Sequence, residues 1–191
     1  DMKLLILLAA LSSSVFAEFT PFSSSNTAQA DTGRDWFQIN SDYVRLIFPE
    51  DRKEQASEIA SLIEHYSHYV GKSYLIDKPQ KFPLVLRPGM ALPNGFVTLA
   101  PRRSEWFNPE SYIPFIGGMS FRDALAIHEY RHVNQFDFSY RSTNKLGYYL
   151  FGEYGLAILL NIGMPNWYFE GDAVWAETKY TEAGRGRSPR F

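Results

Sequence analysis

The sequence predicts an α+β fold, with an N-terminal mixed β-sheet and a packed helix, then a central helix and a helical C-terminal lobe. The first half holds short segments rich in β-branched and aromatic residues, bounded by turn residues, which is typical of strands. The second half carries longer runs with apolar residues at helical spacing. With 191 residues, 45% of them hydrophobic and 16% aromatic, the chain can bury the core of one domain.

Four segments are predicted to be strands. The first two are separated by Asn40-Ser41-Asp42, which is typical of a hairpin turn. Residues 96–99 are our candidate for a free sheet edge, to which an extended peptide could bind through main-chain hydrogen bonds. An ordinary central strand is the alternative for these residues. The four segments are Trp36–Ile39, Tyr43–Phe48, Phe82–Arg87 and Gly95–Ala100.

Residues 50–70 carry apolar side chains at helical spacing, and Gly71 is well placed to end the helix. We expect this amphipathic helix to pack on the sheet. Its His65 and His68 lie three residues apart, a spacing that a second metal site would also show. Because no acidic or histidine partner follows nearby, a surface or core-edge role is the favoured interpretation.

Residues 102–118 contain two prolines and a Gly-Gly pair, and they are predicted to form a loop. Arg102 and Arg103, at its start, are candidates for binding a substrate carboxylate. Solvated loop charges are the alternative.

The segment Ile127–Val133 contains the pattern His-Glu-x-x-His. On a helix, His128 and His132 lie on one face, one turn apart, so both can bind the same ion. Glu129 lies beside the pair, where it would accept a proton from a water held by the metal. Residues 120–123 fit a capping box, which predicts that the helix starts near its serine.

A third metal ligand must come from elsewhere in the chain, and Glu170 is the candidate. Pro165 suits the first turn of a helix that continues through Glu177. Glu170 has apolar neighbours, among which a carboxylate is costly unless it is paired or bound to a metal; a surface glutamate is the alternative. Glu177, two turns later on the same face, would either support a histidine ligand or be solvated.

Residues 144–161 are apolar and aromatic and predict one or two core helices. Gly147, Gly152 and Gly155 are spaced so that neighbouring segments can pack closely. The apolar run at 156–160 is too short to span a membrane, for which roughly 20 residues are needed.

Charge and composition limit the partners of this chain. Nineteen basic and 21 acidic residues give a net charge of −2, which offers no general electrostatic case for a nucleic acid or an anionic membrane surface, so neither is expected. The absence of cysteine excludes disulfides, thiolate metal sites and cysteine nucleophiles. Any metal must therefore be held by His, Asp or Glu.

The two ends of the chain differ from its centre. Residues 1–17 are predicted to be a signal peptide, because Lys3 precedes an apolar run and residues 15–17 fit a small-x-small cleavage site; an uncleaved anchor is the alternative. We therefore expect an exported protein, periplasmic or secreted, without a stable membrane span. Residues 18–35 predict a loose leader, and residues 184–191 the start of a linker to a missing C-terminal region.

The motifs together resemble those of the gluzincin zinc metallopeptidases, whose pattern is His-Glu-x-x-His followed by a glutamate on a later helix. Here the pattern is His128-Glu129-Tyr130-Arg131-His132 and then Trp167-Tyr168-Phe169-Glu170-Gly171. The resemblance implies a zincin-like fold over residues 36–183, Zn²⁺ held by His128, His132 and Glu170, and Glu129 as general base and acid. The stretch is also similar to large exported bacterial proteins that carry a gluzincin-like unit ahead of a β-propeller, which would make a C-terminal β-propeller a partner domain.

Two features depart from that family pattern. Val174 stands four residues after the distal glutamate, where thermolysin-like members carry an aspartate that orients a histidine. The residue that would stabilise the oxyanion also stays unassigned, because Tyr148, Tyr149, Tyr154 and Tyr168 are all candidates.

The prediction is therefore zinc-dependent hydrolysis of a peptide or protein substrate. One alternative is a catalytically inactive zinc-binding or protein-interaction module of a larger exported protein. Another is a helical domain in which His128 and His132 are core residues. The sequence does not indicate endo- or exopeptidase action.

Overall fold

The computed structural model describes residues 33–76, 79–88, 93–109, 118–141 and 144–188. The predicted signal peptide, and the leader up to residue 32, lie outside these ranges. The chain divides into two compact units, Asp1–Arg34 and Asp35–Phe191. The helices and strands of the described residues all belong to the second unit.

Five strands form one mixed sheet, which confirms the α+β class. Their order is β1-β2-β3-β5-β4. The outer pairs β1–β2 and β4–β5 are antiparallel, whereas β2–β3 and β3–β5 are parallel. The strands are β1 (Trp36–Asn40), β2 (Val44–Pro49), β3 (Phe82–Arg87), β4 (Asn94–Leu99) and β5 (Arg102–Phe107).

β5 corrects the prediction that residues 102–118 are a loop. Residues 102–107 form a strand that pairs with β4, and the pairing begins with Leu99 opposite Arg102. Glu105 is fully buried in the sheet, and its two carboxylate oxygens lie 2.8 Å from Arg87 and 2.6 Å from Arg103. These two arginines are what make a buried carboxylate tolerable in the sheet. The prolines and the Gly-Gly pair that predicted a loop all lie after Phe107, where β5 ends.

β4 lies at one edge of the sheet, as predicted for residues 96–99. Its partner is β5 alone among the described strands.

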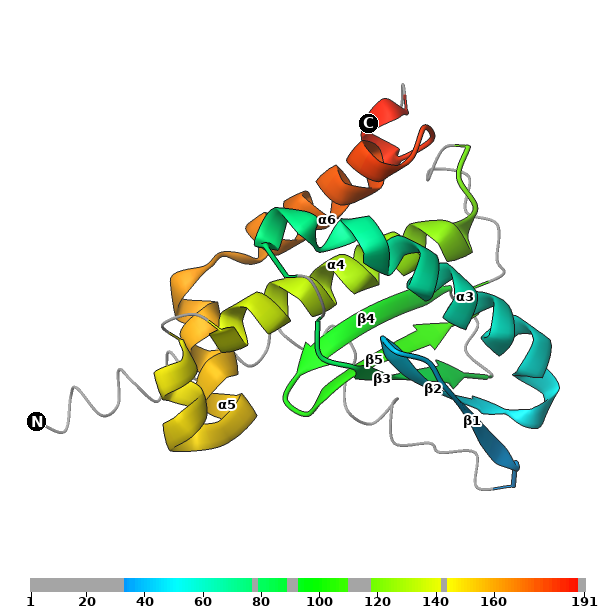
Figure 1. The fold of residues 1–191 in the computed structure, drawn as a ribbon, viewed down its shortest axis with the longest axis horizontal. Helices are drawn as coiled ribbons and strands as arrows, with labels where there is room; N and C mark the ends of the chain where they lie inside the picture. Colours follow the sequence, from blue (N-terminus) through cyan, green and yellow to red (C-terminus); the bar gives the residue numbers. More distant parts are fainter. Residues whose placement is uncertain (1–32, 77–78, 89–92, 110–117, 142–143, 189–191) are drawn as a thin grey trace, which may run out of the picture. The chain divides into compact units, whose positions relative to one another are not determined.

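Four α-helices accompany the sheet: α3 (Lys53–Val70), α4 (Phe121–Arg141), α5 (Lys145–Gly163) and α6 (Asn166–Tyr180). α4 packs against β4, α3 and α6 (Figure 1). Alternate residues of β2 and β3 share one core with apolar residues of α3 and α4, including Val44, Leu46, Ile59, Leu84 and Ile127. Short 3₁₀ turns follow at η1 (Glu50–Arg52), η2 (Lys72–Tyr74) and η4 (Arg185–Arg187).

α5 differs from the predicted core helices. Gly152 has a φ of 65°, which breaks the helix into two halves. A Cβ on Gly155 would lie 2.2 Å from the carbonyl oxygen of Gly147, so the predicted close packing of glycines does occur between the halves. However, among the large side chains of α5 only Leu156 and Leu160 are buried. The other large side chains of α5 do not pack into the core.

No helix within the described ranges is long and apolar enough to cross a membrane. The final described residues, which the sequence predicts to begin a linker, form η4 and pack on α6.

Candidate metal centre

α4 starts where the sequence predicts. The backbone N–H of Asp123 donates to Ser120 Oγ over 3.1 Å, as in a capping box. The Tyr66 hydroxyl on α3 donates to Asp123 Oδ1 over 3.0 Å. The first turn of α4 is thus held both by its own cap and by α3, and this sets the direction in which the later residues project.

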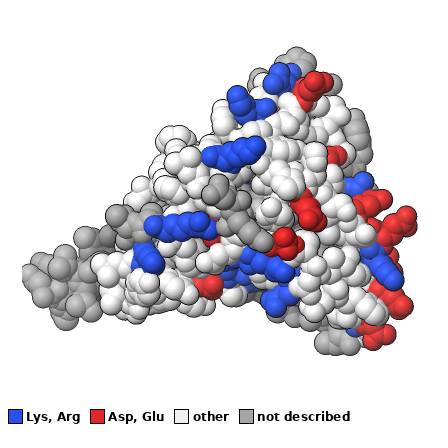
Figure 2. Space-filling view, viewed as in Figure 1, with Lys and Arg blue, Asp and Glu red and all other residues white. Residues whose placement is uncertain are grey.

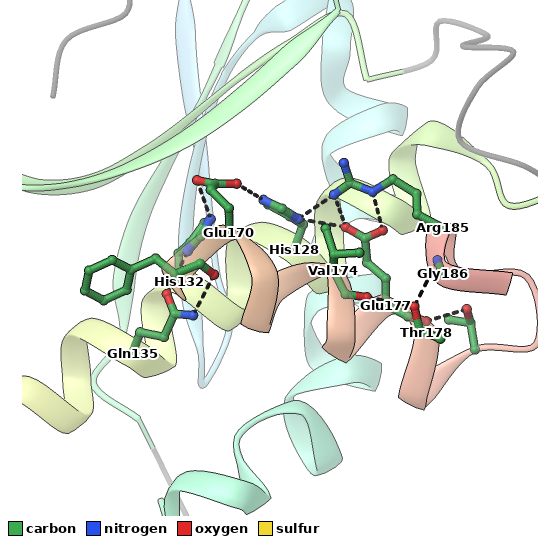
Figure 3. Close-up of polar contacts among 11 residues, drawn as sticks. His128, His132, Gln135, Glu170, Val174, Glu177, Thr178, Arg185 and Gly186 are labelled. Carbon is green, nitrogen blue, oxygen red and sulfur yellow. Dashed lines mark hydrogen bonds and ion pairs between the residues drawn. The ribbon is translucent and has the colours of Figure 1, made fainter. Parts of the chain in front are cut away.

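The three predicted metal ligands lie together. The ligand atoms of His128, His132 and Glu170 are all within 4.8 Å of one another. The Glu170 carboxylate lies 3.1 Å from Nε2 of His128 and 3.6 Å from Nε2 of His132 (Figure 3). Helical spacing brings the two rings to 4.8 Å between centroids, and α6 supplies the carboxylate from across the helix interface.

The other ring nitrogen of His128 is held from α6. Its Nδ1 lies 2.7 Å from Glu177 Oε1, and Glu177 is fully buried. A carboxylate can only accept, so Nδ1 donates to Glu177 and, in the metal-free protein, Nε2 donates to Glu170. Only Nε2 would have to release its proton to bind a metal. Of the two readings that the sequence allowed for Glu177, the structure has the one in which it contacts a histidine.

Arg185, in η4, completes this side of the cluster. Its Nε donates to Glu177 Oε2 over 2.6 Å, and its Nη2 donates to Oε1. Its Nη2 also lies 2.7 Å from His128 Nδ1, but a guanidinium only donates, so the Glu177 contact is the one compatible with a protonated Nδ1. Arg185 was not among the predicted site residues, because a linker was predicted there.

Val174, four residues after Glu170 on α6, carries no hydrogen-bonding side chain. The carboxylate of α6 that contacts His128 Nδ1 is that of Glu177, almost one helical turn further along (Figure 3).

His132 is held by a residue that sequence reasoning missed, Gln135. His132 Nδ1 lies 2.7 Å from Gln135 Oε1. The amide nitrogen of Gln135 donates to the Phe169 carbonyl over 3.0 Å and to Asp172 Oδ2 over 2.8 Å. These two acceptors fix the amide orientation, so Oε1 must accept from Nδ1–H of His132.

An ion pair between Asp172 on α6 and Arg131 on α4 supports Gln135. Asp172 accepts from Arg131 Nε over 2.7 Å and from Nη2 over 2.8 Å. The guanidinium lies 4.2 Å from the ring centroid of Tyr74 and 5.4 Å from that of Trp175. This bidentate pair ties α4 to the helix that carries Glu170, and its flat guanidinium fits between the rings.

Glu129 faces the edge strand. It is only 3% exposed, and its Oε2 has no hydrogen-bond partner among the described residues. A Cβ on Gly95 of β4 would lie 3.4 Å from Glu129 Cγ and 2.8 Å from Leu125 Cδ2. The glycine therefore permits the close approach of β4 to α4, and the unsatisfied buried oxygen calls for a functional explanation.

The ionisable groups shift one another strongly in the metal-free protein. Burial raises the pKa of Glu129 to about 7, against the charge of His128. Burial lowers the pKa of His128, but hydrogen bonds to Glu170 and Glu177 outweigh it, and the net pKa is raised to about 9. Burial, then the charge of His128, lower the pKa of His132 to about 4. The hydrogen bond from His128 lowers the pKa of Glu170 to about 2.

Other predicted candidates lie outside this cluster. His65 packs against the rings of Tyr66 and Tyr69, and His68 against Tyr43, in agreement with the core-edge interpretation. Arg102 donates to the carbonyls of Lys81 and Gln80, and Arg103 pairs with Glu105. Of the four candidate tyrosines, Tyr148 and Tyr149 line a separate cleft.

Comparison of the chain with protein-family models, curated proteins and solved structures found no match. The assignment of a function therefore depends on the geometry of the cluster.

Proposed function

We propose that this chain is a zinc-dependent peptide hydrolase with a zincin-like fold, in which His128, His132 and Glu170 hold the metal. The observation that carries the proposal is the convergence of the three ligand atoms within 4.8 Å. Each imidazole also has its Nδ1 engaged by a neighbouring side chain, which leaves Nε2 as the metal-binding nitrogen.

The donor set fits zinc. Two imidazoles and one carboxylate are a common catalytic set, and three protein ligands leave a position for water. Glu170 is 52% exposed, so solvent and substrate can reach the centre from its side. When bound, zinc lowers the pKa of its water to about 7 and polarises the scissile carbonyl.

Glu129 is the proposed general base. It accepts a proton from the attacking water as the water oxygen bonds to the carbonyl carbon. It then delivers that proton to the amine nitrogen as the C–N bond breaks. Its burial and the lack of a partner for Oε2 among the described residues support this role, because a structural carboxylate would be satisfied.

The proposed substrate is an extended peptide lying along β4. The edge position of β4 leaves main-chain groups that can pair with a peptide irrespective of its sequence. Gly95 brings this strand against Glu129, so a peptide bound there would pass the proposed base.

The test separates metal binding from turnover. Zinc per chain would be measured after equilibrium dialysis for the parent, Glu170→Ala and Glu129→Gln, with the exposed Glu182→Ala as the matched control. We expect near-stoichiometric zinc in the parent, in Glu129→Gln and in the control, and clearly weaker binding in Glu170→Ala. Cleavage of a peptide library should be lost in Glu129→Gln and retained in the control.

Two outcomes would contradict the proposal in different ways. A folded parent that takes up no zinc would refute the metal centre and leave the histidines as core residues. Stoichiometric zinc without cleavage of any peptide would instead favour the inactive zinc-binding module.

A further inference from the structure

The two halves of α5 form a compact helical hairpin with an inner and an outer face. The halves are residues 145–151 and 153–163, and they meet through the Gly147–Gly155 backbone contact. On the inner face, Leu156 and Leu160 pack in a small core with Leu99, Phe136 and Phe169. This core anchors the hairpin to β4, α4 and α6.

The outer face of the hairpin is apolar and exposed to solvent. Six of its large side chains are between 60% and 75% exposed. A single exposed apolar residue is common on protein surfaces, but a group of them usually marks a binding site. Burial of large apolar side chains is favourable, so the face tends to leave water. Its members are Leu146 (66%), Tyr149 (70%), Leu150 (64%), Phe151 (72%), Tyr154 (60%) and Ile162 (75%).

A basic cleft adjoins the first half of the hairpin. It has a volume of about 600 Å³, and its lining includes Arg45, Arg102, Arg141 and Lys145. The neighbouring acids are Glu153, which accepts from the Arg102 backbone N–H, and Asp137, which pairs with Arg141 over 3.0 Å. Among the described residues, four cations against two carboxylates leave an excess of two positive charges here, although the whole chain carries −2. The Arg102 guanidinium donates to backbone carbonyls, so Arg45, Arg141 and Lys145 are the cations that can face a ligand. Figure 2 shows blue side chains beside the mostly white surface over α5.

We propose that the α5 hairpin docks the protein on the surface of an anionic lipid bilayer. The aliphatic and aromatic side chains of the outer face enter the boundary between headgroups and acyl chains, as in other interfacial helices. The tyrosine rings suit the headgroup level. The basic side chains of the cleft face the lipid phosphates.

The composition favours a bilayer over a protein partner. Lys145 lies at the start of the apolar hairpin, with its ammonium 5.4 Å from the ring centroid of Tyr149, and the cores of protein interfaces are depleted in lysine. A lysine beside Leu, Ile and Phe is typical of helices that lie in a lipid interface. The inference does not rest on the metal centre, and the two proposals can fail separately.

The absence of cysteine allows a probe to be placed at one position. The full chain would carry an environment-sensitive fluorophore on Leu150→Cys and, as the matched control, on Leu75→Cys, because Leu75 is 92% exposed and lies outside α5. With vesicles of phosphatidylglycerol and phosphatidylcholine, the label at position 150 should brighten, shift to the blue and be quenched by brominated acyl chains. The label at position 75 should not change.

The charge contribution is tested by Lys145→Ala against Lys179→Ala, an exposed lysine of α6. Each basic residue near an anionic surface contributes about 1 kcal/mol, so the Lys145 variant should require roughly fivefold more lipid for half-maximal signal. The Lys179 variant should match the parent, and pure phosphatidylcholine should give a weaker signal than the anionic mixture.

Three results would overturn the proposal. One is a label at position 150 that stays in water with every vesicle. A second is an equal response at positions 150 and 75. The third is burial of the position-150 label without lipid, together with a dimer by light scattering, which would assign the face to a second copy of the chain.

Discussion

The two histidines of the proposed metal centre occupy different surroundings. On the inner side, His132 is supported by Gln135 and by the Asp172–Arg131 pair between α4 and α6. On the outer side, His128 is supported by the buried Glu177 and, through Glu177, by Arg185 in the short turn after α6. One proposed ligand therefore depends on contacts between two helices, and the other also on a segment that follows the last helix. We expect damage on the inner side to affect folding, and damage on the outer side to affect metal affinity alone.

The largest expected effect comes from breaking the inner ion pair. Arg131→Ala leaves the Asp172 carboxylate partly buried without its bidentate partner, and breaking such a pair costs about 3–5 kcal/mol. The Asp172 side chain is 17% exposed and keeps hydrogen bonds from Tyr74 and Gln135, so we expect a loss at the lower end of this range. Urea unfolding would measure the loss, with Arg122→Ala as the control. Arg122 pairs with the exposed Glu58, and such a pair is worth about 0–1 kcal/mol. Equal losses in the two variants would show that the inner pair has no special role.

The second prediction concerns the direct hydrogen-bond partners of the two histidines, Gln135 for His132 and Glu177 for His128. Replacing a side chain that orients a metal-binding histidine typically weakens metal affinity about 10–100-fold. We expect this range for Gln135→Ala and for Glu177→Gln, measured by competition with a zinc chelator. Gln38→Ala on β1 is the control, since Gln38 is exposed there. Unchanged zinc affinity in both variants, with folding intact, would argue against the tautomers assigned to His128 and His132.

The smallest effect should come from the outermost residue of the cluster. Arg185→Ala removes the donor that holds Glu177 but leaves the contact between Glu177 and His128, so zinc affinity should fall less than in Glu177→Gln. Backbone amides of residues 184–188 should exchange faster with solvent, because Arg185 no longer ties η4 to α6. Arg185→Lys should restore part of the affinity, as one donor remains. Equal hydrogen exchange in the parent and in Arg185→Ala would show that Arg185 does not hold η4 against α6.

Predictions from the sequence were most successful where the pattern was local. The start of α4 at Ser120 follows from a cap that spans four residues, and the stacking of His128 over His132 follows from the helical repeat. The strand edge at residues 96–99 also agrees with the structure. The packed helix predicted over residues 50–70 is present as α3 over 53–70, and residues 50–52 form the 3₁₀ turn η1 before it. The identity of the metal ligands remains a prediction that the geometry supports and that zinc binding would test.

Predictions from the sequence failed where a structural feature depends on contacts between residues that lie far apart in the chain. β5 was missed because the prolines and glycines of residues 102–118 lie after Phe107, whereas the strand itself is stabilised by a contact with another strand, the ion pair between Glu105 and Arg87. Gln135 was missed because its role depends on Asp172 and on the Phe169 carbonyl, both on α6. α5 was predicted to be a core element because its composition is apolar, but composition does not say how many neighbours a helix has.

The sequence by itself determined the His128-Glu129-His132 constellation, since residues on one helix keep their relative positions through the 3.6-residue repeat alone. It also identified Glu170 as the third candidate, because a carboxylate among apolar neighbours needs a partner. Only the tertiary structure decided which side chains hold the histidine rings, that Glu177 is the carboxylate that contacts His128, and that α5 leaves an apolar face in solvent. The physical reason is that these features depend on contacts between α4, α6 and η4, and long-range contacts of this kind carry no periodic signal along the chain.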